Sequence, residues 1–180
     1  ALGDLERPLS PVALAPGHGA GVSQALVNND APPDMSRLLS DDATAADVIA
    51  AVTDNGFDSQ AQDRQHGVVT LDGDAAGFTG SANGDVALDR QAAWASAQGN
   101  ILVSEEVITN ALAAFAAEPD ADLATRLVKA LEAGSEVGGD SRCPEQTALF
   151  AHVVVALPGD DPSAPSIHLI ATVNEGSGEN

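Results

Sequence analysis

Positive charge is scarce in this sequence. Lys129 is the only lysine, and the seven Lys and Arg residues are set against 27 Asp and Glu residues, giving a net charge of −20 over 180 residues. A protein that binds a nucleic-acid duplex needs basic residues to replace counterions along the phosphates, so we expect no nucleic-acid partner. An anionic membrane surface would also repel this chain, so we expect no membrane partner either.

Aromatic residues are also few. Four Phe, one Trp and no Tyr leave Ala, Val, Leu and Ile to fill the core. Because 44% of the residues are apolar, the chain can bury the roughly two-thirds of its unfolded surface that is expected at this size. We therefore expect a single domain over residues 1–180, with small side chains that let helices pack closely on a sheet.

Cys143 is the only cysteine, so the sequence excludes an intrachain disulfide and does not indicate a redox compartment. No apolar run approaches the ~18 residues needed to span a membrane. We expect a soluble protein, secreted or cytoplasmic. Two interpretations of its acidity stay open. Repulsion between carboxylates is screened beyond ~3 Å in 1 M salt, which suits a halophilic protein, and an acidic surface also serves solubility alone.

Hydrophobic periodicity and turn residues predict an α+β fold, with helices packed on a largely antiparallel sheet. In Thr44-Ala45-Ala46-Asp47 the hydroxyl can cap a helix, and Asp72-Gly73 is a strong hairpin turn. The expected elements are an irregular segment over 1–16, a strand over 19–28, a turn over 29–33, helices over 35–39 and 44–56, strands over 67–71, 75–79 and 92–98, helices over 104–115 and 122–134, strands over 147–156 and 166–173, and a frayed tail over 174–180.

Several motifs have a simpler structural explanation. Gly17-His18-Gly19-Ala20-Gly21 opens a strand rather than a helix and precedes no lysine, so it predicts a turn and not a phosphate loop. The histidines show no ligand spacing along the chain, so we expect no metal and no cofactor; they are His18, His66, His152 and His168. Cys143, followed by Pro144, is either a nucleophile without an assigned base or a structural thiol.

Amides and glycines gather in three later segments, 78–81, 97–102 and 138–149. Such residues cap loops, but they can also stabilise a developing oxyanion. Together with Gln24-Ala25-Leu26-Val27-Asn28, these segments resemble the Ntn-hydrolase-like family catalogued as domain of unknown function 1028. The motifs that carry the resemblance are Gln-Ala-Leu-x-Asn, Phe-Thr-Gly, Ala-Gln-Gly-Asn-Ile-Leu and Gly-Gly-Asp-x-Arg, and they span about 16–173.

The resemblance implies a four-layer αββα sandwich with largely antiparallel sheets and an amidohydrolase of unknown substrate. Ntn hydrolases use the amino group of an N-terminal Thr, Ser or Cys as the base for its own side chain. The motifs place six residues at the substrate-binding site, namely Gln24, Asn28, Gln98, Asn100, Asp140 and Arg142.

The sequence departs from this family at its start. Nothing in 1–16 matches the family's first two strands, and Ala1 has no nucleophile, so the catalytic residue is unknown. Two hypotheses follow: an amidohydrolase, or a catalytically inactive fold used for self-assembly or binding. If two strands are missing, an open sheet edge is expected to pair with a second copy of the chain or with a retained N-terminal fragment.

Overall fold

The computed structural model describes residues 11–142 and 150–172. The predicted tail over 174–180, and Cys143 with Pro144, lie outside these residues. Within them the elements follow in the order β1 (Val12–Ala15), β2 (Gly19–Ala25), α1 (Ala31–Ser40), α2 (Ala45–Thr53), the 3₁₀ helix η1 (Ala61–Asp63), β3 (Arg64–Thr70), β4 (Ala75–Thr79), β5 (Val86–Ala92), β6 (Ala95–Leu102), α3 (Glu106–Ala117), α4 (Leu123–Val137), β7 (Phe150–Val155) and β8 (Ile167–Thr172).

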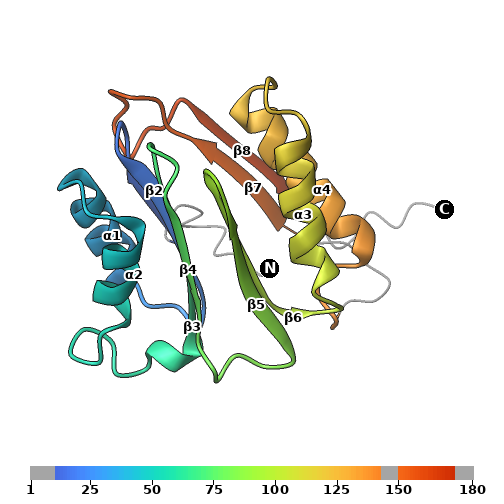
Figure 1. Cartoon of the computed structure of the whole chain (residues 1–180), viewed down its shortest axis with the longest axis horizontal. Helices are drawn as coiled ribbons and strands as arrows, with labels where there is room; N and C mark the ends of the chain where they lie inside the picture. Colours follow the sequence, from blue (N-terminus) through green and yellow to red (C-terminus); the bar gives the residue numbers. More distant parts are fainter. Residues whose placement is uncertain (1–10, 143–149, 173–180) are drawn as a thin grey trace.

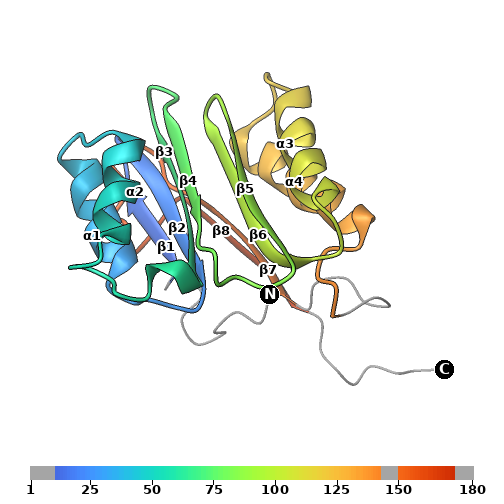
Figure 2. The same cartoon turned by 60° about the horizontal axis from the view of Figure 1, so that its bottom comes forward.

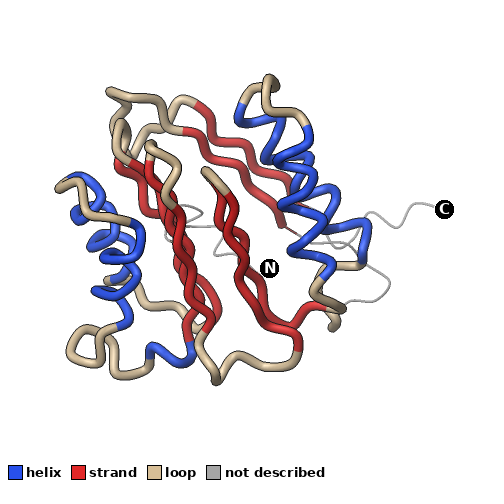
Figure 3. Tube along the Cα trace, in the orientation of Figure 1, coloured by secondary structure: helices blue, strands red, loops and turns tan. Residues whose placement is uncertain are grey.

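Helices lie on the two outer sides of the molecule, with strands between them (Figure 3). α1 and α2 pack on the four-stranded antiparallel sheet, whose strand order is β1-β2-β3-β4. The β5–β6 hairpin contacts β3 and β4, and α3 contacts β5 and β6 from the other side (Figures 1 and 2). β7 and β8 form a separate antiparallel pair beside α4. The predicted α+β fold with antiparallel sheets is confirmed.

The prediction of an irregular segment over 1–16 is wrong for its last residues. Val12–Ala15 forms β1 and pairs with β2, and three of its four residues are buried. Pro11 and Pro16 stand just outside the strand, where proline removes no ladder hydrogen bond. The Gly17 turn between β1 and β2 has a φ of +90°, as the turn interpretation of this motif requires.

The first helix begins earlier than predicted. α1 starts at Ala31, within the stretch predicted as a turn over 29–33, and places Pro32 and Pro33 in its first turn. Proline is tolerated there because the first helical N–H groups have no intrahelical partner. The Thr44 cap of α2 is confirmed, since its hydroxyl accepts a hydrogen bond from the Asp47 amide at 3.1 Å.

One predicted strand is in fact a hairpin. The chain predicted as a strand over 92–98 contains the end of β5, a two-residue turn and the first half of β6, with Ala92 paired to Ala95. Trp94 occupies the turn with a φ of +59°, and its amide donates to the Gly73 carbonyl at 3.2 Å. No Gly or Pro marks this turn, so turn chemistry does not reveal it.

The two predicted helices are confirmed as α3 and α4, which pack against each other, but α4 ends later than predicted. Gly134 does not end α4, which continues to Val137 and stops at Gly138 with a φ of +123°. A Cβ at Gly134 would lie 3.1 Å from the Val107 carbonyl oxygen, so this glycine allows α3 and α4 to approach closely. Arg126 does not pair with Asp122; its Nε donates to the Phe115 carbonyl at 2.9 Å, and its guanidinium lies 4.0 Å from the Phe115 ring centroid.

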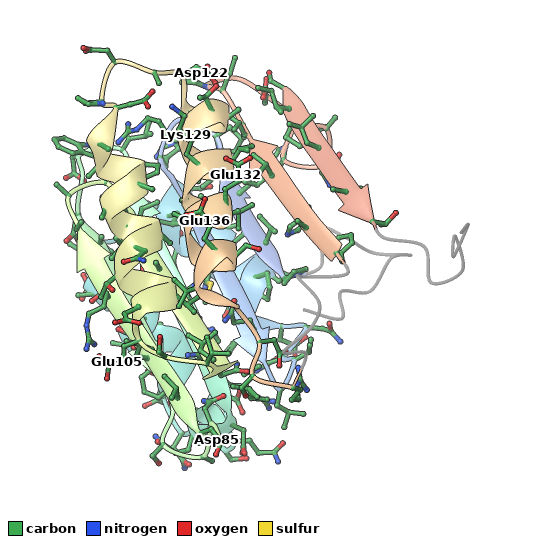
Figure 4. The ribbon with its side chains drawn as sticks, turned by 90° about the vertical axis from the view of Figure 1, so that its right-hand side faces the viewer. Asp85, Glu105, Asp122, Lys129, Glu132 and Glu136 are labelled. Carbon is green, nitrogen blue, oxygen red and sulfur yellow. The ribbon has the colours of Figure 1, made fainter. Side chains whose placement is uncertain are left out.

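The acidic residues lie mainly at the surface. Asp122, Glu132 and Glu136 are exposed, and their side chains lie on the outer side of α4 (Figure 4). In the described part of the chain, no helix is long and apolar enough to cross a membrane.

A histidine lies in the core beneath α1 and α2. His66 in β3 has no exposed surface, and its ring stacks on Phe78 at a centroid distance of 6.3 Å. Burial lowers the pKa of His66 to about 4; the nearby Asp58 charge opposes this shift and the Arg64 charge adds to it. His66 is therefore neutral in the folded protein at neutral pH.

This burial predicts a loss of stability in mild acid. The unfolded chain binds a proton at His66 below pH 6.5 and the folded chain only near pH 4, so the unfolding free energy should fall by about 3 kcal/mol across that window. Urea unfolding from pH 7.5 to 4 measures it. In His66→Gln this part of the pH dependence should disappear, whereas His18→Gln, at a partly exposed position, should keep it. An unchanged slope in His66→Gln would assign the loss to other groups.

Candidate functional site

A fully buried glutamine joins the two packed sheets. Gln65 in β3 faces the β5–β6 hairpin, and its Nε2 donates to the Gly99 carbonyl at 2.8 Å and to Thr79 Oγ1 at 3.1 Å. Its Oε1 accepts from Gln24 Nε2 at 3.0 Å and from Asn100 Nδ2 at 2.9 Å. Gln24 stands directly opposite Gln65 in the β2–β3 register, which explains the first contact.

Three of the six predicted residues meet around Gln65: Gln24, Gln98 and Asn100. Gln24 Nε2 also lies 3.4 Å from the Gln98 carbonyl oxygen. The Gln98 side chain passes over Gly67, where an added Cβ would lie 2.2 Å from Gln98 Oε1. A side chain at position 67 would therefore displace the Gln98 amide from this place. We call Gln24, Gln65, Gln98 and Asn100 the inter-sheet amide network.

One atom of each outer amide remains unused. Among residues 11–142 and 150–172, no group hydrogen-bonds to Gln24 Oε1, Gln98 Nε2 or Asn100 Oδ1. All three residues are only partly buried, so these atoms can meet a ligand or water. The network thus offers one free donor and two free acceptors, all on uncharged side chains.

Hydrogen-bonded polar side chains on the β5–β6 hairpin extend the network. Ser96 Oγ donates to Gln98 Oε1 at 3.3 Å, and Gln91 Nε2 donates to Ser96 Oγ at 3.4 Å and to Asp89 Oδ2 at 3.0 Å. A Cβ at Gly77 would lie 2.7 Å from Asp89 Oδ2, so these hydrogen-bonded side chains lie over β4. Asp89 is the charged group nearest to the network along these hydrogen bonds.

Asn28 belongs to a different cluster. Its Nδ2 donates to Asp58 Oδ2 at 2.8 Å, and Asp58 forms a buried ion pair with Arg64, with Nε 2.9 Å from Oδ2. The hydrogen bond from Arg64 is the largest cause that lowers the pKa of Asp58 to about 2. Arg64 also donates to the Leu26 carbonyl at 2.7 Å, so the cluster holds the chain that leaves β2. Arg64 and Gln65 are consecutive in β3, and they point to opposite faces.

Asp140 and Arg142 lie at the end of β6. Their side chains form an ion pair, with Arg142 Nε 2.9 Å from Asp140 Oδ1, and the hydrogen bond from Arg142 is the main cause that lowers the pKa of Asp140 to about 2. Val103 N donates to the Gly139 carbonyl at 3.0 Å and Ser141 N to the Ile101 carbonyl at 2.8 Å. Among the described residues, no hydrogen bond or ion pair joins Asp140 to the inter-sheet amide network.

This geometry predicts a local effect of Arg142. The Arg142 side chain is 57% exposed, so Arg142→Ala should change the unfolding free energy by less than ~1 kcal/mol. Amide exchange at Val103 and Ser141 should nevertheless accelerate, because Asp140 loses the partner that orders its segment. Arg37→Ala, which removes an equally exposed arginine from α1, should leave both amides unchanged. If the two variants exchange alike, Arg142 has no ordering role.

Sequence reasoning missed Gln65, Asp58 and Arg64. The strand predicted over 67–71 begins at Arg64 in the structure. The predicted range therefore excludes the three buried polar residues at the start of β3. Gly67 in the middle of β3 was the available signal, because an interior strand glycine often marks a close approach of another chain segment. Among the described residues, no group of three or more His, Cys, Asp or Glu side chains could hold a metal ion.

Comparison with known proteins finds a solved structure and a protein family that this chain resembles. The crystal structure of protein SPO2555 from Silicibacter pomeroyi, described as a DUF1028 protein, is 27% identical in sequence and superposes with a TM-score of 0.72. The alignment covers 88% of this chain and 66% of that one, so the chain spans about two thirds of its relative. No curated protein matches. Because the family of unknown function DUF1028 matches residues 11–172, nearly the whole described chain, the protein belongs to that family.

Proposed function

We propose that this protein is an Ntn-type amidohydrolase and that the inter-sheet amide network binds the amide group of its substrate. The observation that carries the proposal is the unused atom on each of three amides that converge from β2 and β6. Two are anchored by the fully buried Gln65, and the third, Gln98, is held by Ser96. Anchoring at one end fixes the amides before a ligand arrives, which reduces the ordering cost of binding.

The free atoms match the chemistry of an amide. A substrate amide offers a carbonyl acceptor and N–H donors, and the network offers Gln98 Nε2 as donor with Gln24 Oε1 and Asn100 Oδ1 as acceptors. During hydrolysis the carbonyl oxygen becomes negatively charged, and a donor aimed at that oxygen stabilises the transition state. The order of layers, helices outside and two strand layers inside, supports an Ntn-hydrolase-like αββα sandwich.

The proposal assigns substrate binding but not the nucleophile. An Ntn hydrolase takes its nucleophile and base from one Thr, Ser or Cys, and the inter-sheet amide network contains none of these residue types. Asn28, Asp140 and Arg142 are retained as supports of the surrounding chain rather than as ligands of the amide.

Side-chain amide signals provide a direct test. In a ¹⁵N-labelled sample, titration with small primary and secondary amides should shift the NH₂ resonances of Gln98 and Asn100, and a coupled assay should detect released ammonia or amine. Asn100→Ala should weaken binding by about 3- to 10-fold, the effect of one neutral hydrogen bond. The control is Asn110→Ala, which removes an exposed amide from α3. If no amide shifts these resonances, the network is purely structural.

A second candidate function is self-assembly by a catalytically inactive fold. Leu169 and Ile170 in β8 are 53% and 49% exposed, and β8 pairs only with β7 in the described part of the chain. An exposed apolar edge strand is a template for pairing with another chain. Native mass spectrometry separates the cases: a multiple of 18.1 kDa indicates a homo-oligomer, and a smaller added mass indicates a retained N-terminal fragment. A monomer that hydrolyses an amide would exclude this candidate.

A further inference from the structure

Two histidines meet across the β7–β8 hairpin. In the strand register His152 is opposite Ile170 and His168 is opposite Val154, so the two histidines are diagonal neighbours on one face of the pair. Their ring centroids are 6.2 Å apart, with an angle of 62° between the ring planes. The spacing along the chain did not indicate this pair, because only the register of the hairpin brings the two rings together.

Each ring has a buried nitrogen without a partner. Among the described residues, His152 Nδ1 and His168 Nε2 have no hydrogen-bond partner. Buried polar atoms in native proteins are almost always satisfied, and an ion is one of the ways in which this occurs. Burial lowers the pKa of His152, and repulsion from His168 lowers it further. A neutral imidazole presents a lone pair, which is the form that binds a metal ion.

The distance between the two ring centroids is close to that of two imidazoles that share one metal ion. With metal–nitrogen bonds of ~2.0–2.1 Å and tetrahedral geometry, two imidazole centroids lie ~5 Å apart. The observed separation of 6.2 Å exceeds this by about 1 Å, which small rotations of the two side chains can close. We propose that His152 and His168 together bind a divalent first-row transition metal ion.

Ligand type and number set the properties of this site. Imidazole nitrogen suits Zn²⁺, Ni²⁺ and Cu²⁺ rather than Mg²⁺ or Ca²⁺, and Cu²⁺ should bind most tightly. No third His, Cys, Asp or Glu joins the pair among the described residues, so water completes the coordination. The many surface carboxylates bind hard cations instead, which gives the experiment its means of separating the two kinds of site.

The bound ion would cross-link the two strands. In the described part of the chain, β7 and β8 form a two-stranded sheet, and an isolated pair of strands is only marginally stable in water. One ligand lies on each strand, so the ion joins the strands in addition to their backbone hydrogen bonds. Binding should therefore protect the β7 and β8 amides from exchange without affecting β1 to β4.

The test titrates the whole protein with Zn²⁺ at pH 7.5 in excess Mg²⁺, by calorimetry, and with Cu²⁺ by electron paramagnetic resonance. We expect two coupled nitrogens in the Cu²⁺ spectrum, slower hydrogen exchange in β7 and β8 with Zn²⁺, and binding that is at least ~10-fold weaker in His152→Gln and in His168→Gln. His18→Gln removes another histidine, which is paired with Asp42, and should bind as the unaltered protein does.

The proposal would be overturned by no binding in excess Mg²⁺, by a Cu²⁺ spectrum without nitrogen coupling, or by equal binding in His152→Gln, His168→Gln and the unaltered protein. The spectrum and the exchange measurement use the unaltered chain, so they decide the question even if a variant fails to fold. If His18→Gln abolishes binding, the ion occupies the His18–Asp42 pair instead.

Discussion

Asp58→Ala should lower the free energy of unfolding by about 4 kcal/mol at pH 7, because it leaves the Arg64 guanidinium buried without its counter-ion. Both side chains are 6% exposed, and the Arg64 Nε lies 2.9 Å from Asp58 Oδ2. Asp58 also accepts from Asn28 Nδ2 and from the Gln60 amide, so the same change frees the chain before α1 and η1. Urea unfolding at pH 7 measures the effect.

The matched control is Asp34→Ala, which removes an acidic partner from an exposed pair on α1. Asp34 and Arg37 are 38% and 57% exposed, so breaking that pair should cost less than ~1 kcal/mol. Acid titration gives a second check. The folded pKa of Asp58 is about 2, below its ordinary value, so its contribution to stability is present above pH 3.8 and lost as the pH falls toward 2. Equal losses in Asp58→Ala and Asp34→Ala would contradict the buried-pair account.

The elements that could be predicted from the sequence are those with local signals. The Thr44 cap, the Asp72-Gly73 hairpin and the two helices α3 and α4 each depend on residues only a few positions apart, and all are present. The predictions were wrong where one residue type can have two structural roles. Pro11 and Pro16 border a strand instead of preventing it, and Gly134 makes room for α3 instead of ending α4.

The candidate site could be predicted only in part, because its centre is a contact between distant segments. Gln24, Gln98 and Asn100 were identified through the family motifs, and the structure brings them together. Gln65 carries no motif; its burial depends on two carbonyls, Leu88 and Gly99, that the β5–β6 hairpin places opposite β3. The same limit applies to the histidine pair of β7 and β8, whose proximity depends on strand register rather than on spacing along the chain.

The second large effect is expected at Gln65. Gln65→Leu replaces the amide with an apolar side chain and leaves the carbonyls of Leu88 and Gly99 without their donor in a buried position. Each unsatisfied buried group costs about 1–3 kcal/mol, so the unfolding free energy should fall by about 4 kcal/mol. Gln24 and Asn100 lose their shared acceptor and are free to turn away. Where the variant is still folded, amide binding should therefore be lost as well.

Gln91→Leu provides the control, because Gln91 has the same side chain but is exposed on β5, where its Nε2 donates to Asp89 and Ser96. An exposed group can exchange its hydrogen bonds for water, so this variant should change the unfolding free energy by no more than ~0.5 kcal/mol. Urea unfolding gives the stabilities, and the NH₂ resonances of Gln98 and Asn100 report the geometry of the network. If Gln65→Leu is as stable as the unaltered protein and still shifts these resonances on adding an amide, Gln65 neither joins the sheets nor positions the site.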